Sequence, residues 1–207
     1  LRAGRECGLL GSLREVTLDM WGPYADAVRE VFGDTVQIVV DRYHVVSNLQ
    51  DCLANGRRAI QRHLSKEAAR VLKGTRWLWA KNPENLTPEE RDQLAALEKQ
   101  FPELAQLTGQ RESLRQIFDD PEIVTPEQGR SRLLAWCEQV RELGITALEK
   151  FTRTPRNWLD EIANDCVSRS TNARTEGFNH GIRSILWRAF GMRNFSHLRL
   201  RVLHAFG

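Results

Sequence analysis

The stretch EVTLDMWGPYADAVREVFGDTVQIVVD, residues 15–41, predicts a strand, a helix and a second strand. Its two ends are short and rich in β-branched and apolar residues, which is typical of buried strands. Between them, Pro23 favours the first turn of a helix and Gly33 favours its end. A crossover of this length makes the two strands parallel. Asp19 and Asp41 are therefore predicted at one edge of the sheet, where α/β proteins bind ligands.

The rest of the chain is predicted to be helical. A stripe of apolar residues from Val45 to Leu64 indicates a long amphipathic helix directly after the second strand. Thr87 and Thr125 each precede a proline and acidic residues, an arrangement that is typical of helix starts. Near the carboxyl end we expect a helix from about Ser170 to Phe190 and a short amphipathic helix over residues 194–206.

We therefore predict a helix-rich α/β chain that has three parts. Residues 1–64 form a strand–helix–strand–helix core. Residues 65–165 form a large all-helical insertion, because strand patterns disappear there and proline breaks divide the segment. Residues 166–207 form the carboxyl-terminal helices, which complete the core.

Composition narrows the class of protein. The chain has 207 residues, of which 41% are hydrophobic and 28% charged, so one or two ordinary globular domains fit. The four cysteines form no Cys-x-x-Cys pair, which argues against a zinc ribbon and a secreted disulfide framework. The sequence has no run of about 18 apolar residues and no signal peptide, so we expect a soluble, cytoplasmic protein without a membrane partner. Because the chain begins with Leu1, we also expect it to be a piece of a longer protein.

The charge is divided into blocks. Residues 82–130 contain eleven acids and five bases, a formal charge of −6, whereas residues 168–207 contain seven arginines and one acid, a formal charge of +6. An arginine-rich segment with almost no acids suits phosphate oxygens, so DNA is the first candidate partner. Charge alone leaves open the alternative that this segment packs on an acidic protein surface. The candidate DNA-binding residues are Arg174, Arg183, Trp187, Arg188 and Arg193.

Three carboxylates suggest metal-dependent phosphate chemistry. Asp19 and Asp41 follow predicted strands, and Glu176 lies near Asn179 on a late helix, on the face opposite its apolar stripe. Mg²⁺ or Mn²⁺ is held by such hard oxygen ligands together with substrate phosphates. Simpler roles remain open for each residue: both aspartates are candidate helix caps, Glu176 is a candidate partner of His180, and His44 is either a metal ligand or a structural histidine that supports Asp41.

Several blocks together resemble a known family. These are LDMWGPY (residues 18–24), VDRYHVV (residues 40–46), Asn172 with EGFN (residues 176–179), and RAFGMRNF (residues 188–195). In this order they closely resemble bacterial insertion-sequence transposases of the ISL-three group, over about Val16 to Val202. The resemblance implies a ribonuclease-H-like catalytic domain with an Asp-Asp-Glu triad, a helical insertion and bound Mg²⁺ or Mn²⁺.

The resemblance also implies roles for individual residues. Asp19 matches the second catalytic aspartate and Glu176 the catalytic glutamate, so these two are the expected metal ligands. Asp41, His44 and Asn179 are accessory residues, although an alternative alignment makes Asp41 the second member of the triad. The family's first aspartate is expected upstream of Leu1, because Glu6 is the one acid among residues 1–14 and has no strand pattern around it.

Two functions follow from these patterns. The first is a transposase that cleaves DNA at transposon ends and joins the ends to target DNA. We expect a homo-oligomer in the active complex, and we expect this piece to be inactive by itself.

The alternative is a non-catalytic helical module that binds DNA or assembles protomers, as in a decayed transposase.

Overall fold

A computed structural model describes residues 1–8, 10–190 and 192–206 of the chain. The chain separates into two compact units, Leu1–Arg169 and Ser170–Gly207, here called the first and second units. The elements of the first unit are α1 (Arg2–Glu6), β1 (Glu15–Leu18), α2 (Gly22–Phe32), η1 (Gly33–Thr35), β2 (Gln37–Val40), α3 (Arg42–Arg62), α4 (Lys66–Gly74), α5 (Arg76–Ala80), η2 (Pro83–Asn85), α6 (Pro88–Gln100), α7 (Pro102–Asp119), α8 (Pro126–Glu142), α9 (Thr146–Glu149), α10 (Arg153–Asn157) and α11 (Leu159–Ser168). The second unit contains α12 (Ala173–Arg188) and α13 (Phe195–Phe206).

The predicted strand–helix–strand unit is confirmed. β1 and β2 pair in parallel, with Glu15 opposite Gln37 and Leu18 opposite Val40. Helix α2 makes the crossover and ends at Gly33, whose φ of 58° is the left-handed conformation that glycine adopts without strain. The fold class is thus a helix-rich α/β arrangement with a small parallel sheet in the described residues.

Helix α11 covers the second strand. The two elements pack closely, and the side-chain amide of Asn164 donates a hydrogen bond from Nδ2 to the carbonyl of Ile38 at 2.8 Å. Val39 and Val40 are fully buried. A segment more than a hundred residues downstream therefore closes the sheet, which keeps the strand backbone away from water.

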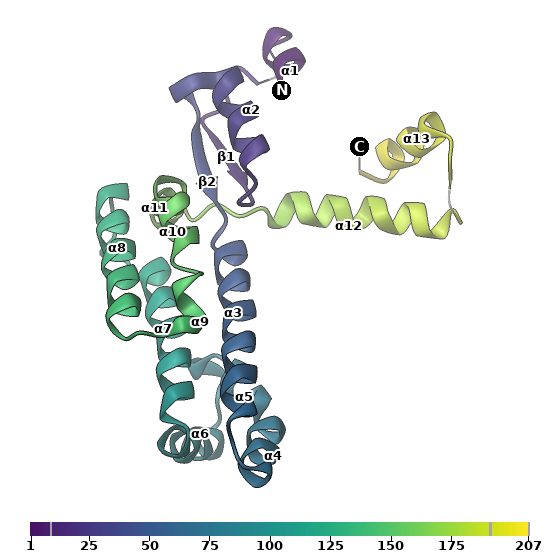
Figure 1. Cartoon of the computed structure of the whole chain (residues 1–207). Coiled ribbons are helices and arrows are strands. Elements are labelled where there is room, and N and C mark those ends of the chain that lie inside the picture. Colours follow the sequence, from purple (N-terminus) through teal and green to yellow (C-terminus); the bar gives the residue numbers. More distant parts are fainter. Residues whose placement is uncertain (9, 191, 207) are drawn as a thin grey trace. The chain divides into compact units, whose positions relative to one another are not determined.

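The helical part of the first unit is built around α3. This helix buries Val45, Leu49 and Leu53, as its apolar stripe predicts, and packs along α7 and α9 (Figure 1). Helix α8 packs on both α7 and α11. The predicted caps at Thr87 and Thr125 are confirmed, since each forms a reciprocal capping box at the start of α6 or α8.

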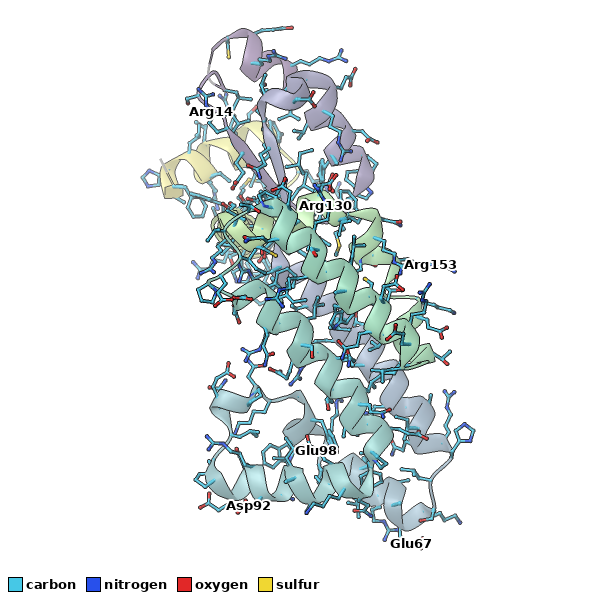
Figure 2. The ribbon with its side chains drawn as sticks, turned by 90° about the vertical axis from the view of Figure 1, so that its left-hand side faces the viewer. Arg14, Glu67, Asp92, Glu98, Arg130 and Arg153 are labelled. Carbon is cyan, nitrogen blue, oxygen red and sulfur yellow. The ribbon has the colours of Figure 1, made fainter. Side chains whose placement is uncertain are left out.

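Charged side chains cover the helices farthest from the sheet. Figure 2 shows Glu67 on α4 and Asp92 on α6 at that end of the first unit, and Arg14 beside the strands. Part of the negative charge of residues 82–130 is compensated within that segment, because Arg115 donates two hydrogen bonds to the carboxylate of Glu84 at 2.7 and 2.8 Å. The predicted boundaries at residues 64 and 165 stay a prediction.

The second unit consists of two helices whose aromatic side chains meet. Phe178 of α12 and Phe206 of α13 contact edge to face, with ring centroids 5.3 Å apart. A glycine inside a helix suggests a close approach at Gly177, but a Cβ there would meet no described atom within 4 Å. The close approach occurs one turn later at Gly181, where a Cβ would clash with the Phe206 ring.

Membrane insertion has no support in the described part of the chain, where no helix combines the length and apolar character needed to cross a bilayer.

Two glycine substitutions test the packing around α3. A Cβ at Gly56 would lie 2.8 Å from the Ala147 Cβ and 2.9 Å from Leu107 Cδ2, so Gly56→Ala should lower the free energy of unfolding by about 1–3 kcal/mol. Gly109→Ala is the matched control, because this exposed position of α7 leaves a Cβ without a described neighbour within 4 Å outside the helix's own backbone. It should stabilise the chain by about 0.5–1 kcal/mol through helix propensity. Urea unfolding of both variants measures the difference, and equal effects would contradict this packing.

Candidate active site

The carboxyl edge of the sheet brings Asp19 and Asp41 to neighbouring positions. Asp19 directly follows β1 and Asp41 directly follows β2, whose last residues, Leu18 and Val40, are paired. The amide of Asp41 donates a hydrogen bond to the Leu18 carbonyl at 3.3 Å, so the hydrogen bonding between the strands continues to the residue that caps α3. The placement of both aspartates at one edge, predicted from the sequence, is confirmed.

The two aspartates differ in their surroundings. Asp41 is only 4% exposed, and its Oδ1 accepts a hydrogen bond from the Tyr43 amide at 2.8 Å. It therefore caps α3, which is one of the roles that the sequence predicted for it. Asp19 is exposed and does not cap α2, whose N-cap is Trp21 without a side-chain hydrogen bond. It is the backbone carbonyl of Asp19 that accepts from the Trp21 amide, at 2.8 Å. Its carboxylate therefore faces solvent, where a ligand can reach it.

His44 belongs to the first turn of α3. Its amide donates to the Asp41 carbonyl at 3.0 Å, and its ring contacts Tyr43 edge to face with centroids 5.7 Å apart. The imidazole is half-buried on the same turn as the capping aspartate. Whether His44 binds a metal or supports Asp41 stays a prediction.

Arg42 connects this edge to the helical part of the unit. Its Nη1 donates to the Phe118 carbonyl at 3.0 Å and to Asp119 Oδ1 at 3.2 Å, both at the end of α7. Its Nε lies 2.9 Å from Oδ2 of Asp165 on α11. A single guanidinium therefore joins the start of α3 to the ends of two other helices, a use that suits the fixed fork of its donors.

Asp165 is a buried carboxylate paired with Arg42 that the sequence pattern did not single out. Its side chain is fully buried, and its Oδ2 forms an ion pair with Nε of Arg42 at 2.9 Å. Burial raises the pKa of Asp165 to about 6; Arg42 opposes this shift and the nearby Asp41 adds to it. A signal existed in the sequence, because Asp165 lies three residues after Ile162 and beside Cys166 on the apolar face of its helix.

The other predicted site residues lie on the second unit. Glu176 is exposed in the first turn of α12, where its amide donates to the Asn172 carbonyl at 2.9 Å, and Asn179 is exposed on the same helix. Arg183, Arg188 and Arg193 are also exposed, and Trp187 is 85% exposed. The side chain of Arg174 lies outside the described residues. Because Asp19 and Glu176 belong to separate units, their meeting around a metal ion stays a prediction.

The donor chemistry at the sheet edge fits a hard divalent cation. No group of three or more histidines, cysteines, aspartates or glutamates in the described residues is placed to hold a metal ion. Mg²⁺, however, commonly takes only one or two protein carboxylates and completes its shell with water and substrate phosphates. The exposed carboxylate of Asp19 fits such a site as one ligand.

Residues 9–202 match a family model described as transposase. The match covers most of the chain, which therefore belongs to the transposases of the ISL-three group.

Two relatives illustrate the similarity. The chain is 26% identical over 202 residues to the transposase for insertion sequence element IS1001 of Bordetella parapertussis, covering 96% of this chain and 49% of that protein. It is 29% identical over 208 residues to the transposase for insertion sequence element IS1557 of Mycobacterium tuberculosis, covering 88% of this chain and 45% of that protein. The chain thus spans about half the length of these curated relatives. No solved structure matches it significantly.

The raised pKa of Asp165 predicts a specific pH dependence of stability. Between an ordinary aspartate pKa of 3.8 and the folded value of about 6, the folded chain binds more protons at this site than the unfolded chain. The free energy of unfolding therefore falls as pH rises through that range, and the contribution of this carboxyl to the fall is up to about 3 kcal/mol. Asp165→Asn should remove this slope in urea unfolding measured across the range.

Asp160→Asn is the control on the same helix, because Asp160 is exposed and its carboxylate lies 2.7 Å from Arg130 Nη2. It should keep the slope of the unsubstituted chain. If the free energy of unfolding changes with pH in the same way in Asp165→Asn and in the unsubstituted chain, the raised pKa does not belong to Asp165.

Proposed function

We propose that this chain is the main part of the catalytic domain of a transposase with a ribonuclease-H-like fold. The intact enzyme cleaves DNA at transposon ends by metal-assisted hydrolysis and joins the freed 3′ hydroxyl to target DNA. The observation that carries this proposal is the pair of adjacent parallel strands that deliver Asp19 and Asp41 to one sheet edge, in a chain of the transposase family.

Asp19 and Glu176 are the proposed metal ligands. Both carboxylates are exposed on their own elements, and oxygen ligands of this kind suit Mg²⁺ or Mn²⁺. A metal ion held by these residues would stabilise charge on the phosphate and would activate the attacking water or 3′ hydroxyl. Burial of Asp41 favours Asp19 over the alternative alignment, because a carboxylate that caps a helix from within the protein is less accessible to a metal and to DNA.

Asp41, His44 and Asn179 have proposed supporting roles. Asp41 fixes the start of α3 by capping it, and His44 follows on the same turn. Asn179 lies one turn after Glu176 on α12 and offers an amide to a phosphate or to the glutamate.

DNA contacts are assigned to the exposed residues of the second unit. Arg183, Arg188 and Arg193 would neutralise backbone phosphates, and Trp187 offers an exposed indole on which a base can stack. Arg174 belongs to the same proposed surface. We propose a homo-oligomer in the active complex, with transposon ends and target DNA as partners.

A non-catalytic module is the second candidate. It is favoured by the second unit itself, which displays Trp187 at 85% and Phe190 at 99% exposure, surfaces that suit binding or assembly without chemistry. The two candidates differ in whether the carboxylates of Asp19 and Glu176 are needed for DNA cleavage.

Substitution of the proposed ligands tests catalysis. In the intact transposase that contains this chain, Asp19→Asn or Glu176→Gln should lower cleavage of terminal-repeat DNA by about a hundredfold or more with Mg²⁺, since each variant loses a ligand charge. Asp34→Asn is a matched control, because that exposed aspartate precedes β2 at the opposite end of the strand. Undiminished cleavage in either ligand variant would rule out the role assigned to that residue.

Asp41→Asn separates the two alignments in the same assay. Asparagine caps a helix about as well as aspartate, so the start of α3 should be kept while the charge is lost. We expect a far smaller loss of cleavage than in Asp19→Asn. A loss as large as that of Asp19→Asn, with unchanged stability, would favour Asp41 as the second catalytic aspartate.

Salt dependence tests the DNA surface. The chain should bind a short mixed-sequence duplex with an affinity that falls steeply as salt rises, because binding releases counterions. Arg183→Gln combined with Arg188→Gln should reduce the slope of log K against log salt by about 0.9 for each phosphate that is no longer neutralised. Arg153→Gln, an exposed arginine on α10, is the control. Affinity that does not change with salt, or no binding at low salt, would contradict this surface.

A further inference from the structure

A cavity of about 90 Å³ lies in the helical part of the first unit, away from the strands. It is lined by Arg57 of α3, Arg76 and Trp79 of α5, and Arg111 of α7, together with polar Gln50 and Thr108 and small or apolar side chains. Among the described residues, no aspartate or glutamate lines it. Three arginines therefore line one small space whose described wall contains no carboxylate.

Two of the residues that line the cavity also carry a buried N–H group without an acceptor among the described atoms. Arg111 is 5% exposed, and its Nη atoms donate to the carbonyls of Trp79, Ala80 and Lys81 at 3.0–3.2 Å and to Glu112 at 3.0 Å. Its Nε, however, is buried without a hydrogen-bond partner in the described structure, and so is Nε1 of Trp79, which is 5% exposed. A buried donor without an acceptor is unfavourable, so two of them on residues that line one cavity favour a ligand there that accepts hydrogen bonds.

The charges around the cavity repel one another. Burial, together with the neighbouring Arg76 and Arg58, lowers the pKa of Arg57 from its usual range. Arg57 donates to Gln61 Oε1 at 3.4 Å, and Arg76 is exposed at the rim. Glu112 compensates part of the charge of Arg111 but also pairs with Arg115 and does not line the cavity. An anion in the cavity would both accept hydrogen bonds from the two N–H groups and relieve this repulsion.

We propose that this cavity binds a phosphate group, held by Arg57, Arg76, Arg111 and the indole N–H of Trp79. A phosphate has several acceptor oxygens in a tetrahedral arrangement, which suits a site with donors from three guanidinium groups. A space of about 90 Å³ suits a group as small as a phosphate. The phosphate comes either from a DNA backbone or from a free phosphate compound. This site is separate in sequence from the proposed metal ligands and extends the function beyond DNA cleavage.

Inorganic phosphate is the probe for the cavity. The chain should show a higher Tm in phosphate than in chloride at equal ionic strength, with saturation that defines a Kd. Combined Arg57→Gln and Arg76→Gln should weaken that Kd by about tenfold or more, since two charged donors are lost. Arg62→Gln is the matched control, because this exposed arginine on α3 does not line the cavity. Arg111 is left unchanged, since its bonds to the end of α5 are needed for folding.

The same variants with a short DNA duplex identify the source of the phosphate. If the double variant binds both inorganic phosphate and DNA more weakly, and phosphate competes with DNA in the unsubstituted chain, the site holds a backbone phosphate. If only inorganic phosphate binding is lost, the site holds a free phosphate compound. No Tm difference between phosphate and chloride, or an equal difference in the double variant and the unsubstituted chain, overturns the proposal. Either failure leaves the Asp19 and Glu176 assignments unaffected, because those are tested by cleavage.

Discussion

The buried carboxylate of Asp165 is the constraint on which the arrangement of the first unit depends. A charge removed from water must be compensated, and the compensation here comes from Arg42 at the start of α3. Since Arg42 also binds the end of α7, the sheet edge, the long helix and the helical insertion are joined at one point. The position of Asp41 and the first turn of α3 follow from that junction, because Arg42 is the next residue in the chain.

The two strand-end aspartates show how similar sequence positions acquire different chemistry. Both follow parallel strands in register, yet α11 and the first turn of α3 enclose Asp41, whereas the loop after β1 leaves Asp19 in solvent. An enclosed carboxylate is suited to capping, and an exposed one is suited to binding a cation and a substrate. The difference supports Asp19 as the proposed metal ligand and Asp41 as the residue that fixes the helix beside it.

Arginine has three distinct uses in this chain. Arg42 and Arg115 pair with carboxylates and hold helices together. Arg183 and Arg188 are exposed on a helix of the second unit, in which no described side chain is buried. Arg57, Arg76 and Arg111 surround a small cavity that no described carboxylate lines. The planar guanidinium group of arginine suits all three uses, and only the surrounding residues decide whether its partner is a protein group or a phosphate.

The sequence by itself determined the local elements: the parallel strand pair, the end of α2 at Gly33, the stripe of α3, the capped starts of α6 and α8, and both carboxyl-terminal helices. These follow from periodicity, turn residues and caps, which act between residues close together in the chain. Only the tertiary structure decided that Asp165 lies buried beside Arg42 and that Asp41 is enclosed while Asp19 is exposed. It also decided that Gly181 rather than Gly177 meets another helix, and that three arginines from separate helices share one cavity. Each of these depends on packing between segments far apart in sequence, and a pattern within one segment carries no information about which distant helix will cover it.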